Sequence, residues 1–372
     1  MPGRILGLAL PLLVTVLFMF ALRPFARSVG LIDRPGGRKQ HIGEIPVIGG
    51  LAMFAGFLIS SIYSYQSFPD YPYLLAGLAV LVVIGMLDDR FDLPAPVRFI
   101  GQACAALLMV GGANVVATNI GHVFFGGIVE LGWFSDLFTI TIVLTAINAF
   151  NMFDGSDGVA GIQAMIGLVF MGIACLMAGQ MGLIPLIVSM IGCLVGFLIF
   201  NWPSNRTKPM RAFMGDAGST MLGFLLAWLA IDLSQGPQPV FSPVVVLWIF
   251  ALPIFDLFSS MIRRVMNGLS PFHGDSDHLH HVLRREGLSS RKVAQAVAFG
   301  AVASAAIGVV GYRTGVPDGV LCLGWLATGV IYHVVFGSGL VLGRRTSSAD
   351  GHLVGGPRVS LEAGPSAKRH SS

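Results

Sequence analysis

The segment from residue 148 to residue 158 concentrates side chains that can bind a metal ion or move a proton. It contains two amides, Asn148 and Asn151, and two carboxylates, Asp154 and Asp157. Apolar runs precede and follow it, so these groups lie where membrane helices meet water. Carboxylates in such a place are costly unless they have partners or a function. We therefore expect other parts of the chain to bring further polar loops to this segment.

Two more acidic clusters lie beside apolar runs. Asp88 and Asp89 follow one run. Asp216 lies between Gly215 and Gly218 at the start of another. Carboxylate and amide oxygens are hard ligands that suit Mg²⁺ together with substrate phosphate and water. Each cluster also has a structural explanation, because Arg90 can hold the adjacent aspartates at a helix end and Asp216 can cap a helix.

A fourth cluster is rich in histidine and ends in His278-Leu279-His280-His281. This spacing is compatible with a transition metal or with structural hydrogen bonds. No cysteine lies nearby, however, and arginines such as Arg264 flank the segment, so a pocket for a diphosphate is favoured. Lys39, in the basic segment 23–45, either contacts the same phosphates or anchors that segment to anionic lipid.

The composition indicates an all-α, polytopic membrane protein. Of the 372 residues, 54% are hydrophobic and 11% are charged, whereas soluble domains carry about 25% charged residues. The four cysteines all lie in apolar runs without paired spacing, which indicates packing rather than disulfides. Nothing in the sequence predicts a nucleic-acid partner.

About eleven apolar runs are long enough to cross a bilayer. They lie at residues 5–22, 46–65, 72–87, 98–117, 136–150, 158–178, 182–200, 217–232, 242–262, 293–311 and 318–342. Only Arg4 and Arg313 fall outside the loops of one side. The positive-inside rule then predicts cytoplasmic basic loops, a periplasmic N-terminus and a cytoplasmic C-terminus. We expect one domain over residues 1–343, a disordered cytoplasmic tail over 344–372 and a short outer β-hairpin at 120–131.

This topology places all four polar clusters on the cytoplasmic side. Carboxylates for Mg²⁺ and cationic groups for phosphate, at the edge of a bilayer, favour phosphoryl transfer from a soluble nucleotide to a lipid. An ion-coupled transporter that uses its carboxylates as a relay is an alternative, although such charges usually lie near the bilayer midplane. A non-catalytic assembly scaffold is a third hypothesis.

The motifs resemble those of the polyprenyl-phosphate N-acetylhexosamine-1-phosphate transferases. The matching stretches are 33–35, 45–50, 88–93, 148–158, 213–219 and 278–281. Within that family the chain is most similar to the bacterial undecaprenyl-phosphate GlcNAc-1-phosphate transferases that begin O-antigen and common-antigen synthesis. The His-x-His-His segment favours that branch over the phospho-MurNAc-pentapeptide transferases of peptidoglycan synthesis. Leu279 departs conservatively from the isoleucine usual in the branch.

The resemblance implies a multi-pass enzyme of the bacterial inner membrane with UDP-GlcNAc and undecaprenyl phosphate as substrates. It implies Mg²⁺, which Mn²⁺ replaces in some members, held by Asp216 and Asn151. Asp88 or Asp89 would deprotonate or orient the lipid phosphate. Two mechanisms stay open for the transfer: direct attack by the lipid phosphate, or a covalent aspartyl intermediate. The remaining implied site residues are Asp154 near the metal, Asp157 on the uridine side, and His278, His280 and His281 around the diphosphate and sugar. The basic residues Lys39 and Arg264 are further candidates for substrate binding. The donor sugar and a possible homodimer stay open.

Overall fold

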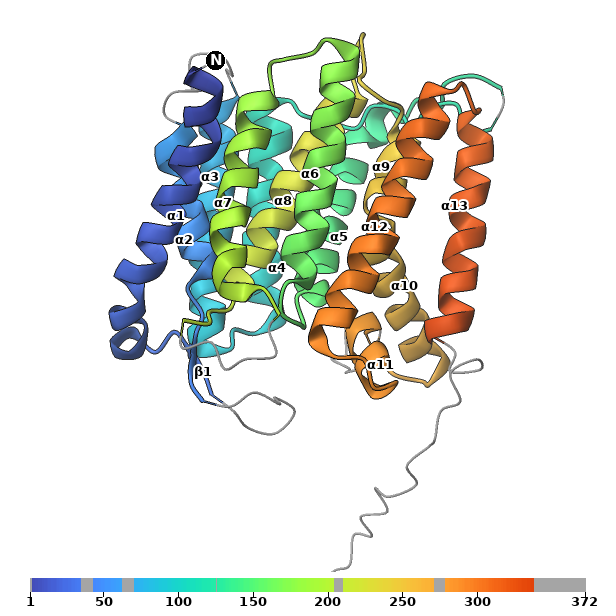
Figure 1. Ribbon diagram of the computed structural model, residues 1–372. Helices are drawn as coiled ribbons and strands as arrows, with labels where there is room; N and C mark the ends of the chain where they lie inside the picture. Colours follow the sequence, from blue (N-terminus) through green and yellow to red (C-terminus); the bar gives the residue numbers. More distant parts are fainter. Residues whose placement is uncertain are drawn as a thin grey trace, which may run out of the picture.

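The computed structural model describes residues 2–34, 43–61, 70–124, 126–203, 210–270 and 278–337. Lys39 and the tail at 344–372 lie outside these ranges, so the predictions made for them stay predictions. The chain folds as a bundle of helices whose long members run roughly side by side (Figure 1). In chain order the helices are α1 (Pro2–Val29), α2 (Gly49–Ser61), α3 (Tyr71–Phe91), α4 (Ala95–Leu107), α5 (Ser135–Phe153), α6 (Val159–Ala178), α7 (Ile184–Asn201), α8 (Gly215–Ser234), α9 (Pro243–Ile249), α10 (Ala251–Met266), α11 (Leu279–Arg285), α12 (Ser290–Arg313) and α13 (Asp318–Tyr332).

The helical architecture confirms the predicted all-α polytopic membrane protein. Within the described ranges, nine helices are long and apolar enough to cross a membrane, and the bent pair of α9 and α10 brings the number to ten if it counts as one span. The short apolar helix α2, 13 residues long, occupies the remaining predicted segment. Each of the eleven apolar runs therefore corresponds to a helix or a helix pair, although one of them is shorter than a full span.

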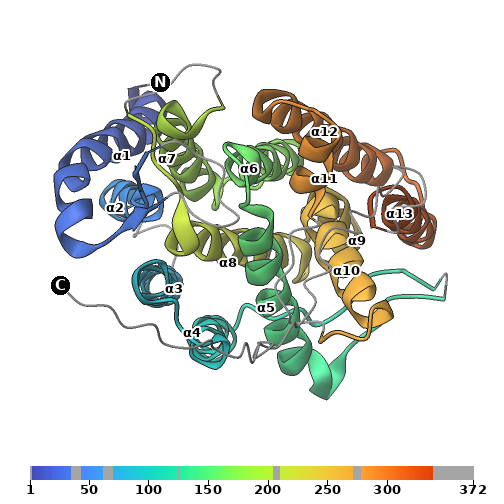
Figure 2. The same cartoon turned by 90° about the horizontal axis from the view of Figure 1, so that it is seen from below.

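The helix α8 forms the middle of the bundle. It is buried along almost its whole length and packs against α2, α3, α5 and α6 (Figure 2). Its contact with α3 is unusually close, because a Cβ added at Gly85 would lie 2.4 Å from the Cα of Ala217. A Cβ added at Gly50 of α2 would lie 2.6 Å from the Cα of Gly218. Small residues thus let three backbones meet at the start of α8.

The bend between α9 and α10 has a local cause. The two helices meet at 78° around Phe250. Pro253 has no N–H to donate to the carbonyl of Ile249, four residues earlier, so a continuous helix would leave that carbonyl unpaired. The buried amide of Gln163 donates to it instead, at 3.1 Å. The break is therefore satisfied inside the protein, as backbone at membrane depth requires.

Two short strands lie at the end of the bundle that also carries α11 (Figure 1). The strands β1 (Ile32–Asp33) and β2 (Ile45–Pro46) are antiparallel, and the next residue, Val47, bridges to Phe213 just before α8. In the segment 120–131, where a β-hairpin was expected, the described residues form one antiparallel bridge, between Asn119 and Glu130, and no strand longer than that. Backbone hydrogen bonds beside it join Ile120 N–H to the Val129 carbonyl and Val129 N–H to the Gly121 carbonyl, both at 3.1 Å.

A small second core lies beside the main one. It joins the end of α5 to α10, α11, α12 and α13, and its buried members are Phe153, Val159, Ala251, Phe255, Leu279, Val293, Val297 and Tyr332. This satellite core holds the segment that begins at His278 against the turn after α5. It thereby brings the histidines to the acidic residues.

Candidate active site

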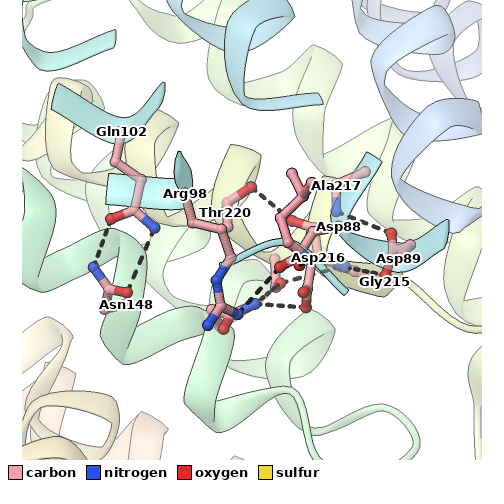
Figure 3. Close-up of polar contacts among 12 residues, drawn as sticks. Asp88, Asp89, Arg98, Gln102, Asn148, Gly215, Asp216, Ala217 and Thr220 are labelled. Atoms are coloured by element: carbon pink, nitrogen blue, oxygen red, sulfur yellow. Dashed lines mark hydrogen bonds and ion pairs between the residues drawn. The ribbon is translucent and has the colours of Figure 1, made fainter. Parts of the chain in front are cut away.

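Asp88 is held by the turn between α3 and α4. α3 ends at Asp92, whose left-handed conformation (φ 51°) reverses the chain. Asp88 Oδ1 then accepts a hydrogen bond from the backbone N–H of Leu93 at 2.8 Å. Its Oδ2 accepts from Arg98 Nη1 of α4 at 3.1 Å (Figure 3). The carboxylate is buried, and these two contacts orient it.

The neighbouring Asp89 holds the start of α8. Its Oδ1 accepts from the backbone N–H of Asp216 at 2.9 Å, and its Oδ2 accepts from Ala217 N–H at 3.3 Å (Figure 3). These N–H groups have no partner within their own helix, so Asp89 supplies the cap from another helix. Gly215 has a positive φ of 74°, and a Cβ there would lie 2.5 Å from Asp89 Oδ2. Only glycine fits both the backbone conformation and the contact.

Asp216 faces the end of α5. Asn151 Nδ2 donates to Asp216 Oδ1 at 2.7 Å and also contacts Ser219 Oγ at 3.1 Å. Asp216 was predicted as a metal ligand with Asn151, and the structure brings the two side chains into direct contact. Asp216 is also in the first turn of α8, yet its own N–H is capped by Asp89, so its carboxylate is not the cap of that helix.

Asp154 and Asp157 lie in the turn that follows α5. Asp154 is half-buried. Desolvation raises its pKa well above its ordinary value, with a further contribution from the charges of Asp216, Asp89 and Asp157. Asp157 is paired with Arg211 Nη2 at 2.6 Å, and the guanidinium of Arg211 lies 5.0 Å from the ring centre of Phe213. Asp157 is thus already neutralised by a cation, whereas Asp154 is surrounded by like charges.

Asp88, Asp89, Asp154, Asp157 and Asp216, together with Asn151, are called the acidic cluster below. They come from the ends of α3 and α5, the turn after α5 and the start of α8. Among the described residues, no three His, Cys, Asp or Glu side chains stand in the geometry of a complete metal site. The donor set nevertheless fits Mg²⁺, because that ion takes one or two protein carboxylates and fills its other positions with water and substrate oxygens. Mutual repulsion among these carboxylates is what a divalent cation would relieve.

The histidine cluster consists of His278, His280 and His281. His280 is 1% exposed, and neither ring nitrogen has a hydrogen-bond partner among the described residues. Its ring stacks on His278 at 5.9 Å and lies 4.3 Å from His281. Burial lowers the pKa of His280 to about 3, and His281 is the next largest cause. The imidazole is therefore neutral, with one N–H donor and one acceptor.

The two clusters meet at Gly155, which lies next to Asp154. A Cβ added at Gly155 would lie 2.0 Å from His280 Nε2. Glycine at this position therefore allows the histidine ring to rest directly on the turn after α5. Arg264, predicted to contact the substrate, is buried in the last turn of α10.

Three charged residues of this region were not among the predicted site residues: Arg98, Arg211 and Asp256. Arg98 lies in the first turn of α4, shortly after the Asp88-Asp89 pair, and Arg211 lies two residues before Phe213. Asp256 is a lone carboxylate in the apolar run at 242–262, and such a residue inside a membrane helix is itself a signal of function. Gln102 and Asn148, from α4 and α5, also form a mutual amide pair at 2.7 and 3.5 Å (Figure 3).

Comparisons with known proteins agree on one family. Residues 71–234, which contain the whole acidic cluster, match glycosyl transferase family 4. The undecaprenyl-phosphate alpha-N-acetylglucosaminyl 1-phosphate transferase of Yersinia pestis is 36% identical over 321 residues, 86% of this chain and 88% of that protein. The protein of that name from Escherichia coli O157:H7 is 36% identical over 86% of this chain and 87% of its own length. The one from Pasteurella multocida is 36% identical over 80% and 83%.

Proposed function

Because this chain belongs to glycosyl transferase family 4, with the undecaprenyl-phosphate GlcNAc-1-phosphate transferases as relatives over most of its length, we propose that it catalyses that transfer. UDP-GlcNAc and undecaprenyl phosphate would give GlcNAc-diphosphoryl-undecaprenol and UMP. An oxygen of the lipid phosphate attacks the phosphorus that bears the sugar. The bond from that phosphorus to the UMP oxygen breaks, and UMP leaves.

One observation carries the proposal. Asn151 and Asp216 are 65 positions apart in sequence, yet Asn151 Nδ2 lies 2.7 Å from Asp216 Oδ1 at the meeting point of α5 and α8. Asp216 and Asn151 would hold Mg²⁺, with Asp154 beside them. Mg²⁺ held there would supply positive charge to neutralise the donor diphosphate, and charge neutralisation is a main requirement of phosphoryl transfer.

The two adjacent aspartates differ in what they can do. Asp89 is committed to two backbone N–H groups of α8, so a change in its position would disturb that helix. Asp88 instead contacts Arg98, whose side chain is partly exposed. We therefore assign Asp88 to the acceptor phosphate, which it would orient or deprotonate, and give Arg98 the role of fixing the Asp88 carboxylate. Asp157 and Arg211 would support the nucleotide side, and His278 and His280 the diphosphate and sugar.

We place the acidic cluster at the cytoplasmic face of the bacterial inner membrane. At this end of the bundle lie Arg98, Arg211 and Arg264, whereas Glu130 and Asp318 lie at the other end. This distribution fits the positive-inside rule. A soluble nucleotide sugar would then arrive from the cytosol, and the lipid phosphate would arrive from the inner leaflet.

The direct test measures UMP release from purified protein in detergent. Release should require UDP-GlcNAc, undecaprenyl phosphate and Mg²⁺ together, and omission of any one should stop it. The same assay with UDP-GalNAc and a 6-deoxy aminosugar nucleotide identifies the donor. UMP release without the lipid phosphate, or none with any of these donors, would contradict the proposal.

A further inference from the structure

Asp256 is a buried carboxylate that none of the assigned roles uses. It lies in the second turn of α10, is 3% exposed and stands between the apolar residues Phe255 and Leu257 in the sequence. Burying a carboxylate is costly unless hydrogen bonds compensate for the lost water. The hydrogen bonds of Asp256 therefore indicate which role its carboxylate has.

Three donors from two segments, the start of α11 and the end of α13, converge on Asp256. Oδ2 lies 2.9 Å from His278 Nδ1. Oδ1 accepts from the backbone N–H of Leu279 at 2.8 Å and from the hydroxyl of Tyr332 at 2.9 Å. The carboxylate thus joins α10 to the start of α11 and to α13, and both of its oxygens are occupied.

These contacts determine which nitrogen of His278 carries the proton. An ionised carboxylate only accepts hydrogen bonds, so Nδ1 of His278 must be the donor. Ser260 Oγ lies 3.4 Å from the same nitrogen and accepts from Arg263 Nη2 at 3.0 Å, which is compatible with Nδ1–H. Any contact of His278 with a substrate must then be made through Nε2.

We propose that Asp256 is a positioning residue that holds His278 in the Nδ1–H tautomer with Nε2 directed to the donor diphosphate. This inference rests on the proposed function for the role of His278, but the contact between the two residues does not. Asp256 acts through His278 and does not itself touch the substrate. The same principle operates in hydrolytic triads, where replacing the aspartate by asparagine retains the geometry but selects the wrong tautomer.

A purely structural role for Asp256 is the competing explanation, since the carboxylate also ties α10 to α13. A double-mutant cycle separates the two. If Asp256 acts through His278, Asp256→Asn and His278→Ala each lower kcat by on the order of 10²-fold, and the double variant stays within about twofold of His278→Ala. A double variant whose kcat falls by the product of the two single losses would overturn the proposal.

A matched control is Asp318→Asn. Asp318 is also buried, and its Oδ2 accepts from the backbone N–H of His122 at 3.0 Å and from Ser242 Oγ at 2.6 Å, at the opposite end of the bundle. We expect Asp318→Asn to keep kcat within about twofold of the wild type, since the change is far from the substrate. A loss equal to that of Asp256→Asn would show a general effect of removing a buried carboxylate and would also overturn the proposal.

A spectroscopic readout does not depend on activity. In protein labelled with ¹⁵N-histidine, the signal that His278→Ala removes identifies His278. Its nitrogen shifts should show Nδ1–H in the wild type and Nε2–H in Asp256→Asn. The same tautomer in both proteins would overturn the positioning role. If the wild type released no UMP at all, the proposed function would fail, while this measurement would still decide the role of Asp256.

Discussion

The acidic cluster and the histidine cluster are neighbours, but burial shifts the pKa values of their side chains in opposite directions. The acidic cluster forms at the start of the central helix α8, and burial raises the pKa of Asp154 among other carboxylates. The histidine cluster rests on the satellite core, and burial lowers the pKa of His280 to about 3 beside His281. A cation would relieve the repulsion among the carboxylates of the first region, and the neutral imidazole of the second can donate one N–H to an anionic oxygen. Their contact at Gly155 suits a ligand that has both, such as a metal-bound diphosphate.

The largest expected effect concerns the acidic cluster. Asp216→Asn removes the carboxylate that faces Asn151 but keeps its size. UMP release should fall about 10³-fold, because stabilisation of the transferring group by the ion is worth several kcal/mol. Asp136→Asn, in the exposed first turn of α5 at the opposite end, is the control and should retain activity. Equal rates for Asp216→Asn and the wild type would remove Asp216 from the site.

The boundary between the clusters should be the next most sensitive position. Gly155→Ala places a methyl group against His280, so the ring or the turn after α5 must move. Activity should fall about 10²-fold, as for a displacement of about 1 Å, and stability should fall by about 1–3 kcal/mol from overpacking. Gly172→Ala is the control, since its Cβ would lie 3.5 Å from Ile187, an ordinary contact. If both variants behave alike, the two clusters are not in close contact.

Mg²⁺ should distinguish the clusters by their effect on thermal unfolding. An ion at one hundred times its dissociation constant stabilises the folded state by about 2.7 kcal/mol. We expect MgCl₂ to raise the Tm of the wild type and of His280→Gln relative to EDTA. The rise should be absent in Asp216→Asn. A Mg²⁺-dependent rise that survives in Asp216→Asn but disappears in His280→Gln would reverse the assignment of the two regions.

Changes of stability with pH are the smallest effects per pH unit, and they should have opposite signs for the two clusters. Asp154 has a raised pKa, so above its ordinary value of 3.8 the unfolded chain loses a proton that the folded protein keeps. Stability therefore falls as pH rises through that window, by up to about 1.4 kcal/mol per pH unit. Asp154→Asn should reduce this dependence in metal-free buffer, as measured by Tm between pH 5 and 8.

His280 should show the reverse dependence. Its pKa in the folded protein is about 3 against an ordinary 6.5, so below pH 6.5 the unfolded chain binds a proton that the folded protein does not. Stability falls as pH decreases through that window, with the same limit of about 1.4 kcal/mol per pH unit. The Tm of His280→Gln should be less sensitive to acid than that of the wild type. Parallel profiles for the two proteins would show that His280 is not kept neutral by burial.

The sequence by itself determined the class of protein and the membership of the acidic cluster. Apolar runs of bilayer length dictate helices, because the backbone has no water to bond with in lipid. Asp88, Asn151, Asp154 and Asp216 each follow or begin such a run, so one-sided loops already implied that they share a face. The family motifs supplied their expected chemistry.

Only the tertiary structure decided which contacts each of these residues makes, and therefore which role each can have. Asp88 and Asp89 are adjacent and chemically identical, yet close packing of Gly85 on Ala217 commits Asp89 to the cap of α8 and leaves Asp88 beside Arg98. Asp256 belongs to an apolar run and acquires a role only through the satellite core, which brings His278 and Tyr332 to it. Hydrogen bonds between distant segments depend on distances of tenths of an ångström, and no local pattern of residue types encodes them.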